Sequence, residues 1–155
     1  MTVSLSSDVV ALLNAADTVK ILATADADGA PHAVEKQSLH AAEDGTIHYL
    51  ERLESSATNR NLVRAIWFDA TVAIALKGGD GRTVQIKGRP VKAHITGALF
   101  QSHYVRLRET EGDADLAAVW VIEPTQVTDQ SLARRRAAEE AAHPTFIHLD
   151  RIAKI

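Results

Sequence analysis

The sequence contains no cysteine among its 155 residues, and this absence removes several kinds of chemistry at once. Disulfide bonds, thiolate nucleophiles and thiolate metal sites are excluded, while a reducing compartment is permitted. The chain also lacks a run of about 18 apolar residues, which a membrane-spanning helix would need. Its first residues, MTVSLSSDVVALL, lack the basic stretch of a signal peptide, and Asp8 interrupts their apolar run. We therefore expect a cytoplasmic protein with no membrane segment.

Positive charge is not in excess either, because the formal net charge is -3 at pH 7. Binding to nucleic acid or to an anionic membrane requires a broad basic surface, so we expect neither partner. The one basic cluster, Arg134 to Arg136, is followed by Glu139 and Glu140 at the i, i+4 spacing of a helix. This pattern is typical of a solvated helix face whose charges pair with one another.

Motifs for nucleophilic, phosphate-loop or metal chemistry are missing. No G-x-S-x-G occurs, and the glycine-rich segment 78–81 lacks the Gly-Lys-Ser/Thr of a phosphate loop. The seven histidines show no HxxxH or HxH spacing with nearby carboxylates, so we expect structural or surface roles and no metal site. They are His32, His40, His48, His94, His103, His143 and His148.

The sequence does contain the apolar content and alternation of one globular domain, with 46% hydrophobic and 24% charged residues. Period-two alternation bounded by turn residues predicts six strands. They span residues 19–25, 31–40, 46–52, 71–76, 82–95 and 117–127. Helices are expected near the N-terminus, after Ser55 or Ser56, over 97–108 and over 130–142, with a short apolar segment at 146–149.

Most of these strands are joined by hairpin turns, which predicts an antiparallel barrel of the α+β class. The alternation changes phase between Gly88 and Pro90. A β-bulge at that point would let the sheet curl.

The strand predicted over 31–40 carries consecutive polar residues, Glu35 to Ser38, in its middle. A half-buried strand would carry a polar residue only at every second position. Two interpretations remain open. The strand faces a ligand or another subunit, or it lies at the edge of the sheet, where charge is tolerated.

The segment 53–76 combines a polar helix start with an amphipathic helix and a buried strand. Ser55 and Ser56 are good N-cap residues, and the range 58–61 adds hydroxyl, amide and cationic groups. The unpaired N–H groups and dipole of a helix start stabilise an anion, although most polar caps only cap. Leu62 with Ile66 and Val63 with Trp67 are i, i+4 pairs on one apolar stripe, and we expect the exposed apolar end at Trp67 and Phe68 to need a covering surface.

The order of these parts resembles the FMN-binding split-barrel family, the pyridoxamine 5'-phosphate oxidase-like group. The shared features, over about residues 19–127, are the hairpin Asp26-x-Asp28-Gly29-x-Pro31-His32, the helix start Arg60-Asn61-Leu62, the strand Val72-Ala73-Ile74 and the strand segment Lys87-Gly88-Arg89. The resemblance implies one six-stranded antiparallel split β-barrel domain over residues 1–155, with a helical tail from 130.

The resemblance also implies FMN at the interface of a homodimer. The implied contacts are Val34, Glu35, Lys36, Gln37 and Ser38 along the flavin ring, Leu50 and Glu51 beside it, Ser55, Ser56, Thr58, Asn59 and Arg60 around the phosphate, and Thr83 and Gln85 on a further strand. Many relatives have basic residues where this chain has Ala57 and Thr58, which leaves Arg60, Lys36 or Arg52 as counter-charge for the phosphate.

The resemblance therefore implies an FMN-dependent oxidoreductase acting with a small-molecule substrate or electron donor. The alternatives are a non-enzymatic flavin-binding or electron-carrier module, and a haem-binding relative on the same barrel. The sequence identifies no catalytic residue, as expected if the flavin performs the redox chemistry. Glu35 and Glu51 form either a pair of carboxylates or the partners of Lys36 and Arg52.

Overall fold

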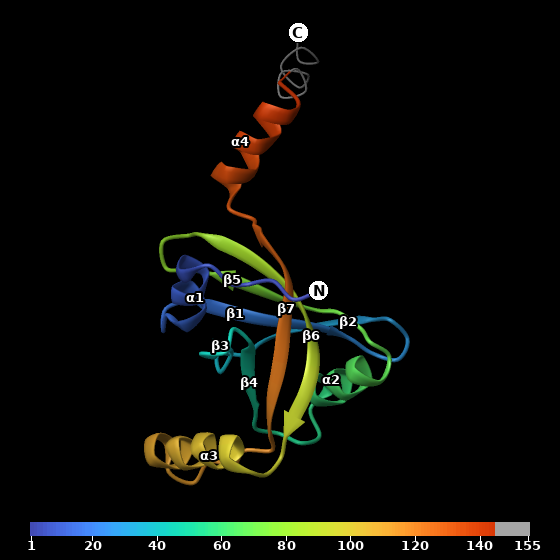
Figure 1. Ribbon diagram of the computed structural model, residues 1–155, viewed down its shortest axis with the longest axis vertical. Coiled ribbons are helices and arrows are strands. Elements are labelled where there is room, and N and C mark those ends of the chain that lie inside the picture. The colour runs from blue at the N-terminus through green and yellow to red at the C-terminus, as the bar shows by residue number, and fades with distance from the viewer. Residues whose placement is uncertain (145–155) are drawn as a thin grey trace.

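The computed structural model describes residues 1–144, and its main element is one antiparallel sheet curled into a half-barrel (Figure 1). The seven strands lie in the order β2-β1-β5-β6-β7-β4-β3. The elements are α1 (Ser7–Asn14), β1 (Val19–Ala25), β2 (Pro31–Glu35), β3 (His40–Ala41), β4 (Ile47–Glu51), α2 (Ala57–Trp67), β5 (Val72–Lys77), β6 (Thr83–His94), α3 (Ala98–Glu111), β7 (Ala118–Asp129) and α4 (Leu132–Ala142). The predicted α+β class is confirmed, but the predicted number of six strands is wrong.

The extra strand arises because the strand predicted over 31–40 is interrupted by a turn at 36–39. Side chains from β1 and this turn replace the hydrogen bonds of a continuing strand. The Lys20 N–H donates to Gln37 Oε1 at 3.0 Å, and Gln37 Nε2 donates to the Thr18 carbonyl at 2.9 Å. The buried Lys20 ammonium donates to the Leu39 carbonyl at 2.8 Å, and burial lowers its pKa. Both halves of the interrupted strand, β2 and β3, are edges of the sheet, as the edge-strand interpretation expected.

The core lies on the inner face of the sheet, where alternate residues of five strands meet the two helices α1 and α2. Its largest buried side chains include Trp120, Tyr49, Leu13, Leu22, Ile47, Leu62, Ile74, Leu76, Ile86 and Ile122. Only part of the apolar stripe expected on α2 is buried. Leu62 is buried, whereas Ile66 is 40% and Trp67 is 80% exposed, and Val63 is exposed as well. The buried face of α2 consists instead of Thr58, Asn61, Leu62 and Ala65.

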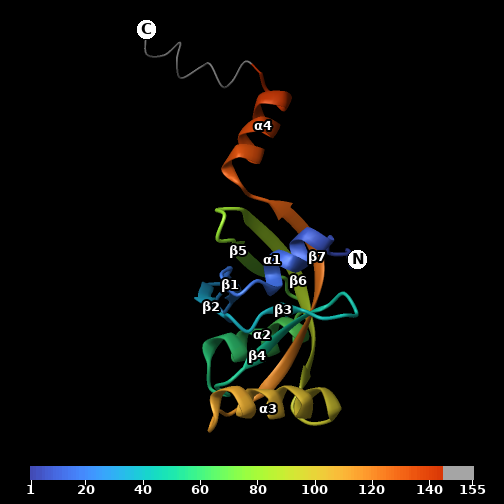
Figure 2. The same ribbon diagram turned by 90° about the vertical axis from the view of Figure 1, so that its left-hand side faces the viewer.

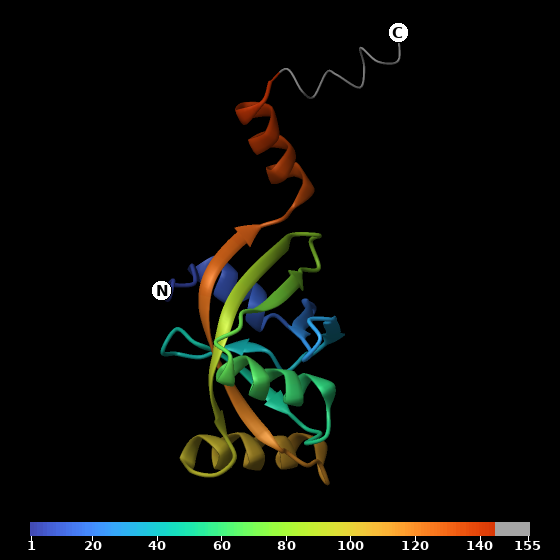
Figure 3. The same cartoon turned by 90° about the vertical axis from the view of Figure 1, so that its right-hand side faces the viewer.

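The predicted bulge is confirmed in the pairing of β6 with β7, two strands of 12 residues each that curve along the body (Figures 2 and 3). Their register shifts between Lys87 and Gly88, and again between Pro90 and Lys92. A Cβ at Gly88 would lie 2.7 Å from the Glu123 carbonyl oxygen, so only glycine lets β7 approach this closely.

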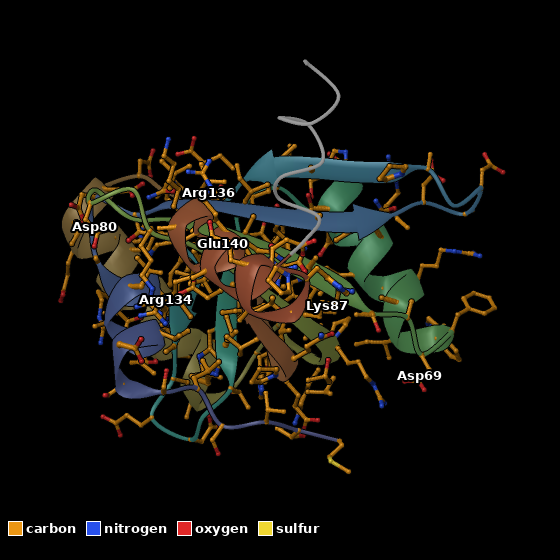
Figure 4. All side chains as sticks on the ribbon, turned by 90° about the horizontal axis from the view of Figure 1, so that it is seen from above. Asp69, Asp80, Lys87, Arg134, Arg136 and Glu140 are labelled. Atoms are coloured by element: carbon orange, nitrogen blue, oxygen red, sulfur yellow. The ribbon has the colours of Figure 1, made fainter. Side chains whose placement is uncertain are left out.

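Helices α3 and α4 lie at opposite ends of the molecule (Figure 1). Neither contains a fully buried residue. Figure 4 looks onto α4 from above and shows Arg134, Arg136 and Glu140 along it. The ion pairs expected within this helix do not form among the described residues, and Arg134 instead lies 3.6 Å from the Asp129 carboxylate.

The apolar segment predicted at 146–149 lies outside the described residues. Within residues 1–144, no helix has the length and apolar content to cross a membrane.

Candidate functional site

A cleft of about 480 Å³ opens where the turn 36–39 meets β4 and the C-terminal part of α3. The turn is held in place by Lys20 and Gln37, so the cleft depends on a contact between distant parts of the chain. The residues that line it are Glu35, Lys36, Gln37, Ser38, Tyr49, Leu50, Glu51, Arg52, Leu53, Leu107 and Glu111. Most of the residues implied to contact a flavin ring are thus brought together.

Ser38 ties the turn to β4 and sets one wall of the cleft. Its hydroxyl donates to the Leu50 carbonyl and accepts from the Leu50 N–H, both at 3.1 Å. The Lys36 ammonium lies 5.6 Å from the centroid of the Tyr49 ring, within range of a cation–π contact. The cleft therefore contains a positive charge above an aromatic ring, beside apolar side chains of β4 and α3.

Glu51 is a carboxylate that is only 1% exposed, and three donors surround it. Tyr49 Oη donates to Oε2 at 2.6 Å, Ser56 Oγ donates to Oε2 at 2.8 Å, and the Leu53 N–H donates to Oε1 at 3.1 Å. Burial, followed by the hydrogen bond and negative charge of Glu51, raises the pKa of Tyr49 far above 10.

Glu51 is therefore satisfied by neutral donors, and neither of the two interpretations of this carboxylate applies. Arg52 instead pairs with Glu111, at 2.6 Å, on the rim of the cleft. Both side chains of that pair are about half exposed.

The start of α2 is capped as predicted, but the cap residue is also hydrogen-bonded to a carboxylate of the protein. Ser56 Oγ accepts from the Asn59 N–H at 2.9 Å, which confirms Ser56 as the N-cap. Because Ser56 also donates to Glu51, a carboxylate of the protein lies beside the helix start. A phosphate in the same place would meet a buried negative charge.

The other residues implied to bind phosphate are engaged elsewhere. Asn59 donates to the Glu54 carbonyl at 3.0 Å and accepts from Trp120 Nε1 at 2.9 Å. Arg60 donates to the Ser55 carbonyl at 3.0 Å. Thr58 is the exception, because its Oγ1 is buried without a hydrogen-bond partner among the described residues.

The predicted site residues consequently form separate groups. Arg60 lies in a second cavity of about 410 Å³ between α2 and the β1–β2 hairpin, together with Arg64 and His32. Thr83 and Gln85 pair with the end of β5, at the other end of the sheet from α3 (Figure 1), and do not line the cleft. Val34, on β2, pairs with Leu22 on β1 and does not line the cleft either.

The cleft also contains residues for which the sequence pattern carried little signal. Tyr49 belongs to the alternation of β4, whereas Leu107 and Glu111 come from α3 and could not be connected to β4 by local spacing. The full set of added lining residues is Tyr49, Leu53, Leu107 and Glu111, and Arg52, named above as possible counter-charge, lines the cleft as well.

Three histidines form a second polar group next to the cleft. His40 and His48 are directly paired between β3 and β4, and His103 reaches them from α3. Ring nitrogens of all three lie within 4.8 Å of one another. Burial, followed by the neighbouring His40 and His48, lowers the pKa of His103 to about 4, and burial likewise lowers the pKa of His48. Sequence spacing could not reveal this group, because each member comes from a different element.

No protein-family model matches the sequence, and no curated protein matches it. Solved structures do share its fold. HupZ from Group A Streptococcus has a TM-score of 0.68 at 19% identity, covering 83% of this chain and 95% of that one. An FMN-binding protein from Syntrophomonas wolfei has a TM-score of 0.66 at 17% identity, covering 79% and 84%. A candidate pyridoxamine 5'-phosphate oxidase from Lactobacillus delbrueckii has a TM-score of 0.61 at 20% identity, covering 81% and 93%.

Proposed function

From the fold of pyridoxamine 5'-phosphate oxidase-like split barrels, which this chain adopts, we propose that it is a flavoprotein that binds FMN in the cleft between the turn 36–39 and β4. The observation that carries the proposal is that most of the ring-contacting residues of the resemblance line one cleft of about 480 Å³. One neighbour in fold is an FMN-binding protein, which agrees with this cofactor class.

The residues of the cleft fit the ring portion of a flavin. Leu50, Leu53 and Leu107 offer apolar contacts to the ring, and Glu35, Lys36 and Gln37 offer polar side chains at its edge. Bound flavin supplies the redox chemistry, while the protein orients the ring and tunes its electron affinity. The positive charge of Lys36 would favour the more negatively charged redox or protonation state of a bound flavin ring.

The phosphate end fits less well at the position implied by the resemblance. Glu51 lies beside the start of α2, and Arg60 points into another cavity. The cations that do line the cleft are Lys36 and Arg52. We assign the phosphate to these two residues, with Arg52 exchanging Glu111 for the phosphate.

A homodimer completes the proposal. Thr83 and Gln85 lie too far along the sheet to line the cleft of their own chain, so a second copy would have to bring them there. Trp67 and Phe68, 80% and 68% exposed at the end of α2, form an apolar surface that such a copy could cover.

The test is a titration of purified protein with FMN, followed by flavin absorbance and fluorescence. We expect one flavin per chain, and Lys36→Ala should weaken binding by roughly 10-fold, since a charge-assisted contact is worth about 1.5–3 kcal/mol. Lys92→Ala, which removes an exposed lysine on β6 outside the cleft, is the matched control and should leave binding unchanged. An unchanged flavin spectrum after FMN is added would disprove the proposal.

A second measurement separates the enzyme from the electron carrier. Rapid reduction of the bound flavin by a nicotinamide donor would support the oxidoreductase that we propose. Tight flavin binding without such reduction would support the non-enzymatic module.

A further inference from the structure

The histidine cluster is formed by His40 on β3, His48 on β4 and His103 on α3. The ring centroids lie 5.3 to 6.0 Å apart, and the three candidate ligand nitrogens lie within 4.8 Å of one another. Among the described residues, the rings of His48 and His103 form no hydrogen bond. Three partly or fully buried imidazole rings that meet in this way leave ring nitrogens available for a shared ligand.

A hydrogen bond of His40 indicates which of its nitrogens is free to bind a ligand. Its Nδ1 lies 2.8 Å from the Ser38 carbonyl oxygen, which can only accept a hydrogen bond. Nδ1 must therefore carry the proton, and Nε2 keeps its lone pair free for a ligand. A hydrogen bond from the far nitrogen to a carbonyl is the usual way in which proteins orient a metal-binding histidine.

We propose that His40, His48 and His103 bind one divalent transition metal ion of the zinc class. Three imidazoles suit Zn²⁺, and a site with three protein ligands keeps a fourth position for water or a substrate. Tetrahedral bonds of about 2.0–2.1 Å place ligand nitrogens roughly 3.4 Å apart. Small rotations of the histidine side chains would close the cluster from its present width.

The fourth position opens into a small cavity. This cavity, of about 240 Å³, is lined by His40, Leu50, His103, Arg106, Leu107 and Thr110. The Arg106 guanidinium would favour an anionic fourth ligand, such as hydroxide or a carboxylate, over a neutral one.

Metal binding would also fasten α3 to the sheet. This helix has no fully buried residue, and His103 is its contribution to the cluster. Leu50 and Leu107 line both this cavity and the larger cleft, so an ion here would fix a wall of the cleft. The metal proposal does not depend on flavin binding.

Calorimetric titration with Zn²⁺ tests the proposal, using protein that carries no histidine tag. We expect one ion per chain, and Co²⁺ in its place should give the absorption of a tetrahedral site. His48→Ala and His103→Ala should each lose at least the roughly 10–100-fold in affinity that even outer-shell changes cost. His32→Ala removes a histidine on β2 that lies outside the cluster, and it should bind Zn²⁺ as the parent protein does.

A second readout is independent of affinity. Zn²⁺ should raise the unfolding temperature of the parent protein and of His32→Ala, but not that of His103→Ala, a half-exposed position where the variant should fold. The proposal is overturned if the parent protein binds no ion. It is also overturned if His32→Ala loses as much affinity as His103→Ala.

Discussion

At the scale of single residues, Glu51 decides the character of the candidate site. A buried carboxylate normally has a cationic partner, but this one accepts from Tyr49, Ser56 and the Leu53 N–H. Its charge lies at the helix start where the resemblance implied a phosphate. Two negative groups at one helix start repel each other, so Glu51 works against phosphate binding at that position.

Glu51→Gln should therefore change ligand preference and stability in opposite directions. Loss of the negative charge should increase the preference for FMN over riboflavin by up to about 10-fold, which is about 1.4 kcal/mol. The free energy of unfolding should fall by about 1–3 kcal/mol, because the buried donors lose a charged acceptor. Flavin titrations and urea unfolding measure the two effects. Glu43→Gln, which changes an exposed carboxylate outside the cleft, serves as control, and equal preferences in all three proteins would contradict the expectation.

Tyr49 should make the protein sensitive to alkaline pH. Its pKa is raised in the folded state, so the unfolded chain loses this proton first, at its ordinary pKa of 10.0. Stability should be unaffected by this group below pH 10 and should fall as the pH rises above it. An absorbance titration of tyrosinate should show that Tyr49 stays protonated until the protein unfolds. Ionisation of Tyr49 in the folded protein would argue against this burial effect.

At the scale of elements, the bulge in β6 lets the two long central strands, β6 and β7, curve together. The register shifts on either side of Gly88 and Pro90 bend β6 and β7 together, and the curled sheet encloses the core. The bend requires close contact between the two backbones. That contact is possible only because position 88 has no side chain.

Gly88→Ala should consequently destabilise the protein by about 1–3 kcal/mol. The added Cβ would lie 2.7 Å from the Glu123 carbonyl oxygen and 2.8 Å from Ile122 Cγ2, and neither atom can move freely. Gly79→Ala is a matched control, because the new Cβ would meet only the flexible Asp17 carboxylate there. Urea unfolding should show a clearly larger loss for position 88 than for position 79, and similar losses would disagree with the proposed role of Gly88.

At the scale of the whole molecule, the homodimer that we propose would cover an exposed apolar surface. Trp67 and Phe68 project from the end of α2, and the Arg64 guanidinium covers only part of this surface, 4.4 Å from the centroid of the Phe68 ring. The cleft also lacks the residues Thr83 and Gln85, which the resemblance assigns to the same site. Both observations support a second copy of the chain.

Light scattering should accordingly give the mass of two chains. Replacing both Trp67 and Phe68 with serine should shift the mass toward one chain, because it removes the apolar area that drives association. Leu132→Ser, which changes a 72% exposed leucine on α4, should leave the dimer intact. A single-chain mass for the parent protein would refute the homodimer.

The sequence by itself determined the local features of the fold. Alternating apolar residues and Gly-containing turns located most strands, the phase change marked the bulge at Gly88, and Ser56 was recognised as a cap. Each of these depends on backbone preferences within a few residues, which neighbouring residues reveal directly.

Only the tertiary structure decided the contacts between distant segments. Lys20 and Gln37 interrupt the strand predicted over 31–40, and three histidines from β3, β4 and α3 meet. Local periodicity contains no information on which side chains meet across such separations. The sheet brings the three histidines together because β4 lies between β3 and β7. The strand β7 follows α3 and is far from β3 in the chain. The chemistry of this protein is therefore set by its strand order as much as by its residues.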